Sequence, residues 1–148
     1  MRPEVPNVFQ TFAADLLMRV VPAVSPTYHQ GTIGMLAATL AIVAEEWDRA
    51  ASWRVEENRS LRELFRDSAP AVKDDALRAK LVALSGTDDR DLRISALTAN
   101  NSALRAALIE LHCYVESVRS EDSRRIEAAI WRELVESTQR RRLSSAQF

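Results

Sequence analysis

The sequence has few of the residues that interrupt helices. Only three glycines and five prolines occur among 148 residues, so turns are few and the segments between them are long. Alanine, leucine, arginine and glutamate are frequent, and all four favour helix. No segment alternates apolar and polar residues over a useful length, and no Asn-Gly or Asp-Gly hairpin turn occurs. The composition predicts an all-α chain.

The residues that usually hold metals or act as nucleophiles are also scarce. The chain has one cysteine, Cys113, and two histidines, His29 and His112. A single cysteine excludes an internal disulfide and suits a reducing compartment. Carboxylate-bridged di-iron bundles need Glu-x-x-His on two helices, whereas Ile109 precedes His112 at that spacing and Pro26 precedes His29. Because no hydrolase, zinc-protease or phosphate-loop motif is present either, we expect no catalytic residues, no metal ligands and no cofactor.

Charge and hydropathy exclude further classes. The formal net charge is −1, which argues against a nucleic-acid partner. The one dense basic cluster, Gln139 to Leu143, complements the negative end of a last helix; the alternative is contact with nucleic acid or an anionic surface. The longest nearly unbroken apolar run, Ile33 to Ala44, is too short to span a bilayer. The first residues lack the order of a signal peptide, so we expect no membrane segment and a cytoplasmic location.

Helix signals divide the chain into five segments. Asn7 caps a first helix to about Val21, and Pro26 opens a second that has no stop before Asp67, so it either runs unbroken or kinks near 51–54. A third ends at Gly86 in a left-handed cap, a fourth begins at Thr87 or Asp88, and a fifth covers about 121–142. We predict a single domain, an up-and-down bundle of four to five helices with one long central helix and frayed ends at 1–6 and 143–148.

Asparagines interrupt two heptad seams. Asn58 lies at a core position of the second helix and Asn101 at a core position of the fourth. A buried asparagine costs stability but fixes register, because it needs a polar partner. Asn58 and Asn101 either meet each other across the bundle or each meets its own copy in a dimer; alternatively, both face solvent near a helix end.

A run of small residues in the second helix suggests close helix packing. Gly34, Ala37 and Ala41 lie at spacings of three and four, which lets another helix approach closely. This segment is therefore central in the bundle or lies on a dimer interface.

These features favour a non-catalytic interaction protein that self-associates, most simply as a homodimer, or serves as an accessory subunit of a protein partner. The alternative is a helical bundle that binds a small molecule or a metal. Its pocket would be lined by the tyrosines and histidines together with one glutamate, which stands four residues after His112 on the same helical face. These residues are Tyr28, His29, His112, Tyr114 and Glu116.

Overall fold

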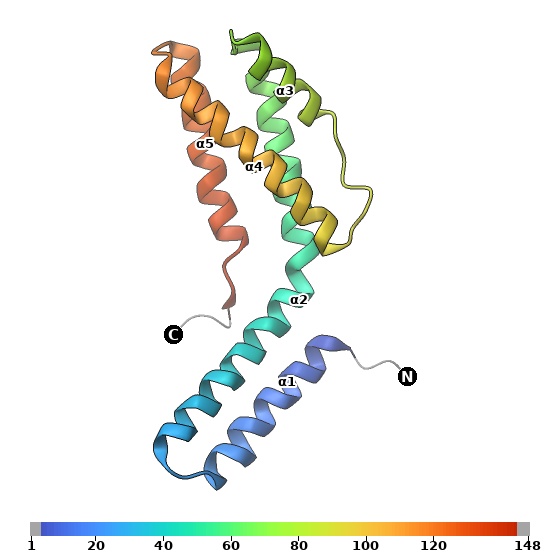
Figure 1. Ribbon diagram of the computed structural model, residues 1–148, viewed down its shortest axis with the longest axis vertical. Coiled ribbons are helices and arrows are strands. Elements are labelled where there is room, and N and C mark those ends of the chain that lie inside the picture. The colour runs from blue at the N-terminus through green and yellow to red at the C-terminus, as the bar shows by residue number, and fades with distance from the viewer. Residues whose placement is uncertain (1–3, 145–148) are drawn as a thin grey trace. The chain divides into compact units, whose positions relative to one another are not determined.

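The structure, a computed structural model, describes residues 4–144, which form five α-helices and no strand (Figure 1). The helices are α1 (Val5–Asp15), α2 (Thr27–Ser68), α3 (Asp75–Ser85), α4 (Ile94–Ser117) and α5 (Glu121–Arg140). The prediction of an all-α chain of four to five helices with one long helix is confirmed. None of the described helices is both long and apolar enough to cross a bilayer.

The described residues group into two compact units. Unit 1 contains 4–50 together with 142–144, and unit 2 is Ala51–Arg141. The boundary therefore lies inside α2, which is an unbroken helix of 42 residues, in the region where the sequence left a kink open. Between Pro26 and Pro70 no proline occurs, so no missing backbone donor interrupts the helix.

Unit 1 is a hairpin of two antiparallel helices. A π-helical turn (Leu16–Val20) and a 3-10 turn (Val21–Ala23) follow α1 and lead into the first half of α2 (Figure 1). The C-terminal segment is held on α2, because Ser144 donates from its backbone nitrogen and its hydroxyl to the Glu45 carboxylate at 2.9 and 3.0 Å.

Unit 2 has a large apolar core. The second half of α2 packs with α3, α4 and α5, and successive helices run in alternating directions (Figure 1). The largest of its fully buried apolar side chains come from all four helices: Leu61, Phe65, Leu81, Leu97, Leu104, Leu111 and Ile130. Leu61 and Phe65 are four residues apart on α2, and Leu97, Leu104 and Leu111 recur every seven residues on α4, as expected of a buried helical face.

Several helix ends differ from the prediction. Helix α1 begins at Val5, with proline in its first turn, instead of after an Asn7 cap. Gly86 follows α3 with φ −89°, so the expected left-handed cap is wrong. Helix α4 begins at Ile94 instead of near Thr87, because the intervening segment crosses unit 2 and buries Asp89. Of the ends predicted to be frayed, 1–3 and 145–148 lie outside the described residues.

Candidate functional site

The residues proposed for a ligand pocket belong to different units. Tyr28 and His29 lie exposed in the first turn of α2, in unit 1. His112, Tyr114 and Glu116 lie on α4, in unit 2. Within unit 2 their contacts are to neighbouring side chains and backbone: His112 Nε2 is 3.7 Å from Glu116 Oε1 and its ring packs edge-on against Trp131. The Tyr114 hydroxyl accepts a hydrogen bond from the Lys73 backbone nitrogen at 2.9 Å.

The two asparagines that interrupt the heptad seams bond to each other within one chain. Asn101 Nδ2 donates to Asn58 Oδ1 at 2.9 Å. Asn58 Nδ2 in turn donates to Asp89 Oδ1 at 3.1 Å and to the Leu97 carbonyl at 3.4 Å. Both asparagines are buried. Of the two pairings that the sequence left open, the structure has the one across the bundle, between α2 and α4.

Asp89 closes this network with a buried ion pair. Its carboxylate accepts from both terminal nitrogens of Arg62, at 2.7 and 3.0 Å, and from Asn100 at 2.9 Å. Arg62 Nε donates to the Thr87 hydroxyl at 2.9 Å. The hydrogen bonds from Arg62 are the largest cause that holds the pKa of Asp89 below its usual value, against the opposing effect of burial. The network therefore pins the segment before α4 onto α2.

A second buried carboxylate, Glu57, ties the end of α5 to α2. Arg105 Nε donates to it at 2.6 Å, and Arg141 donates through two nitrogens at 2.7 to 3.1 Å. Burial raises the pKa of Glu57, but hydrogen bonds from Arg141, Asn101 and Arg105 outweigh it, so the net shift is downward. The Arg141 guanidinium also lies 4.6 Å from the centroid of the Trp53 ring. In the basic cluster near the C-terminus, Arg141 thus pairs with an internal carboxylate, as Arg140 does with Glu133.

Asn101→Leu is expected to lower the free energy of unfolding by about 1–3 kcal/mol, because it leaves the buried Oδ1 of Asn58 without its donor and removes one of the several donors to Glu57. Since both partners belong to one chain, the oligomeric mass should not change. Urea unfolding followed by circular dichroism gives the first quantity and native mass spectrometry the second. Ser102→Leu, at an exposed position of the same helix, is the control. A changed mass for Asn101→Leu alone would place the asparagine between copies.

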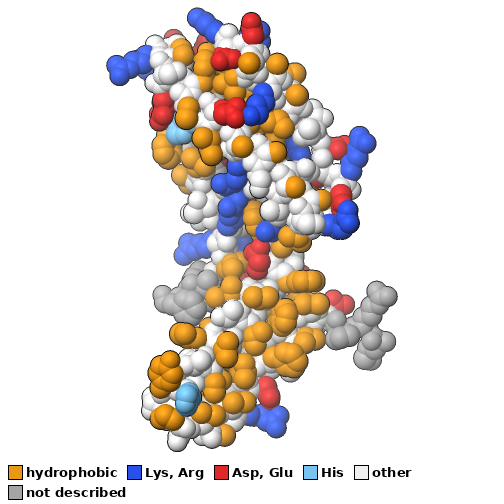
Figure 2. Space-filling model, in the orientation of Figure 1, with side chains coloured by type: hydrophobic (Ala, Val, Ile, Leu, Met, Phe, Trp, Pro, Cys, Tyr) orange, Lys and Arg blue, Asp and Glu red, His pale blue; other side chains and the backbone are white. Residues whose placement is uncertain are grey.

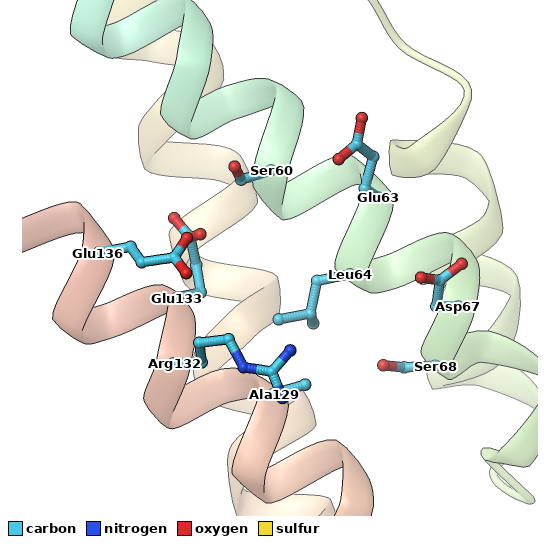
Figure 3. Close-up of a pocket in the computed structure, with 9 residues that line it drawn as sticks. All are labelled: Ser60, Glu63, Leu64, Asp67, Ser68, Ala129, Arg132, Glu133 and Glu136. Atoms are coloured by element: carbon cyan, nitrogen blue, oxygen red, sulfur yellow. The ribbon is translucent and has the colours of Figure 1, made fainter. Parts of the chain in front are cut away.

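A polar groove lies between α2 and α5 in unit 2 (Figure 3). Acidic side chains from both helices line it, and Leu64 points into its middle; the lining residues are Ser60, Glu63, Leu64, Asp67, Ser68, Ala129, Arg132, Glu133 and Glu136. Within residues 4–144 no group of three histidine, cysteine, aspartate or glutamate side chains could hold a metal ion. Among the acidic residues that line the groove, Glu133 is the one that is buried.

Glu133 titrates near neutrality. Burial raises its pKa to about 7, and the charges of Glu57 and Glu136 act in the same direction. The charge and hydrogen bond of Arg140 oppose the rise without cancelling it. Glu133 thus differs from Glu57, whose several donors hold the charged form in place.

We expect stability to fall as the pH rises toward 7 because of Glu133. Between the ordinary pKa of 4.5 and about 7 the folded chain holds a proton that the unfolded chain has released. The stability that protonated Glu133 contributes is therefore fully present below pH 4.5 and is lost as the pH rises through 7. Its upper limit is about 3 kcal/mol. Urea unfolding at several pH values should show this decline in the parent and in the control Glu56→Gln, an exposed glutamate of unit 2 that does not act on Glu133, but not in Glu133→Gln. Parallel profiles for all three proteins would contradict the assignment.

Unit 1 exposes apolar side chains that the sequence patterns did not single out. Every residue of unit 1 that is buried, within 4–50 and 142–144, is an alanine: Ala13, Ala37, Ala44 and Ala50. Large apolar side chains of the same unit are exposed, at Phe12, Leu17, Met18, Tyr28, Met35, Leu36, Val43 and Trp47. Figure 2 shows hydrophobic side chains over much of the visible face of this unit. Trp47 is among them, although it stands eleven residues before Asn58 and therefore in the same heptad seam of α2.

A compositional signal for this surface was present in the sequence. No aspartate, glutamate, lysine or arginine occurs between Arg19 and Glu45, whereas charged side chains are frequent throughout unit 2. Of the small residues expected at an interface, Ala37 is buried, while Gly34 and Ala41 are half-buried. A Cβ added at Gly34 would meet nothing within 4 Å among the described residues, so none of their contacts requires glycine there.

Comparison of the chain with family models, with curated proteins and with solved structures gives no match.

Proposed function

We propose that the protein is a self-associating interaction module that acts as a homodimer in the cytoplasm. Unit 2, with its core and buried ion pairs, serves as the stable scaffold. Unit 1 supplies the surface through which the protein assembles. A role as an accessory subunit of a larger complex is compatible with the same surface.

The observation that carries the proposal is the mismatch between what unit 1 buries and what it exposes. Its buried residues among those described are four alanines, and alanine burial contributes little compared with burial of a leucine or a phenylalanine. Two helices with so little buried apolar surface gain too little to offset the conformational entropy lost on folding. Burying the exposed apolar side chains against a partner would supply the missing stabilisation.

Native mass spectrometry and light scattering of the purified chain, over a hundredfold range of concentration, test this proposal. We expect a dimer that dissociates on dilution. Hydrogen exchange should show that amides of unit 1 lose protection as the dimer dissociates, whereas the core amides of unit 2 keep theirs. A monomer at every concentration, with equal protection in both units, would refute self-association.

A further inference from the structure

The helical hairpin of unit 1 carries a continuous apolar face, and we propose that two copies of the chain meet through it. This inference rests on the proposed self-association and adds which surface is used and what covers it. The apolar strip, as we call this face, consists of Phe9 and Phe12 on α1 and of Leu36, Leu40, Val43 and Trp47 on α2.

Spacing places the residues of each helix on one side. Leu36, Leu40, Val43 and Trp47 follow one another at intervals of four, three and four residues, and Phe9 and Phe12 at three. Such residues share a face of a helix. Four of the six are largely exposed: Phe12 by 55%, Leu36 by 55%, Val43 by 39% and Trp47 by 60%.

Helix geometry places the strip residues of α1 and those of α2 on the same side of the hairpin. Phe12 directly precedes the buried Ala13, and Leu36 directly precedes the buried Ala37. Each of these large side chains is therefore turned by about 100° in the same rotational sense from the alanine that faces the other helix. Because α1 and α2 run antiparallel (Figure 1), equal turns of the same sense bring the two side chains to one side.

The same construction puts Val43, which directly precedes the buried Ala44, on that side as well. The C-terminal segment lies on another side of α2, since Ser144 and the Arg142 carbonyl bond to Glu45 and Arg49. Glu45 directly follows Ala44, so it is turned by about 100° in the opposite sense. The described part of the C-terminal segment therefore leaves the apolar strip uncovered.

The absence of charge favours a second copy as the occupant. The stretch 20–44 has no charged residue. Asp15 at the end of α1 and Arg19 in the π-helical turn after it pair with each other at 3.0 Å. An uncharged surface has no charges that could pair with those of a charged partner. Two copies of it can meet without electrostatic repulsion. The same strip on another copy is complementary in chemistry, as a two-fold interface requires.

The exposed area is sufficient for a small dimer interface. If each of the six side chains exposes on average about two fifths of roughly 200 Å², one strip offers about 500 Å². Two strips then bury about 1,000 Å², which is the minimum expected of a specific interface. Two hairpins packed through their strips would form a four-helix bundle, with the exposed leucine, valine and tryptophan as its core layers.

The experiment compares Val43→Glu with the matched control Met35→Glu. Both residues lie on α2 within unit 1 and both are exposed, Met35 by 70%, but Met35 lies about 160° around the helix from the buried alanines and outside the strip. Dissociation constants come from native mass spectrometry and light scattering. We expect Val43→Glu to raise the dissociation constant at least a hundredfold and Met35→Glu to change it less than threefold. Unfolding of the unit 2 core, followed by hydrogen exchange, should be unchanged in both variants.

The outcomes separate this inference from the proposed function. If the parent is a dimer and both variants stay dimeric, or both dissociate equally, the strip is not the interface, although self-association stands. If the parent is a monomer, self-association itself fails and the strip with it. A monomer that binds neutral lipid vesicles through unit 1, with binding lost in Val43→Glu, would overturn the choice of a second copy in favour of a membrane surface.

Discussion

Asp89→Ala is expected to lower the free energy of unfolding of unit 2 by about 3–5 kcal/mol, the loss typical when one partner of a buried ion pair is removed. The side chains of Arg62 and Asp89 are only 8% and 6% exposed. The variant would leave a guanidinium charge inside unit 2 without its carboxylate. It would also remove an acceptor from the amides of Asn58 and Asn100.

Chemical denaturation followed by circular dichroism measures the effect. Asp88→Ala is the matched control, because the neighbouring carboxylate is exposed and pairs with the exposed Arg90; its change should stay within about 0.5 kcal/mol. Since a domain of this size is typically stable by about 5–15 kcal/mol, Asp89→Ala should be partly unfolded at moderate temperature. Equal losses in the two variants would show that the Arg62–Asp89 pair does not hold the segment before α4.

Phe65→Ala is expected to destabilise unit 2 by about 3–5 kcal/mol. Phe65 is fully buried in the core, among residues of α3, α4 and α5. Removal of its ring leaves a cavity that the surrounding helices fill only in part, so the loss exceeds the transfer free energy of the deleted atoms.

Phe12→Ala is the matched control for the same chemical change in unit 1. Phe12 is exposed and lies on the apolar strip, so its truncation should leave the unfolding of unit 2 unchanged and weaken the proposed dimer instead. Hydrogen exchange distinguishes the two units, because it reports amide protection residue by residue. If Phe12→Ala destabilises the core of unit 2 as much as Phe65→Ala does, the two units are not independent in stability.

Three buried carboxylates determine how the stability of unit 2 depends on pH. Asp89 and Glu57 have lowered pKa values, so the stability they contribute is complete at neutral pH and is lost only when the pH falls through their folded values. Glu133 acts in the opposite direction between 4.5 and about 7. Unit 2 should therefore be most stable at moderately acid pH. In Glu133→Gln the loss of stability between that pH and neutral pH should be smaller.

Much of the local structure was determined by the sequence itself. A shortage of glycine and proline, with many strong helix formers, excluded strands and required long helices. The spacing of Leu104, Leu108 and Leu111 is that of one helical face, and all three are buried on α4. The sequence predicted helix boundaries less well where a residue could either cap a helix or form part of a connecting segment. Thr87 and Asp88 resemble a helix cap, yet the segment is drawn across unit 2 by the bond between Asp89 and Arg62, 27 residues apart.

Only the tertiary structure decided which polar groups are buried together and which apolar groups have no partner. Glu57 and Arg141 are 84 residues apart, and no local pattern relates them, because periodicity describes one helix at a time. The same limit explains Trp47. Its spacing is that of a core residue, but burial requires another helix opposite it. Trp47 is 60% exposed, whereas the buried residues of α2 within unit 1 are alanines. The sequence determined that these side chains share a helical face; the packing of the chain decided that the face remains open.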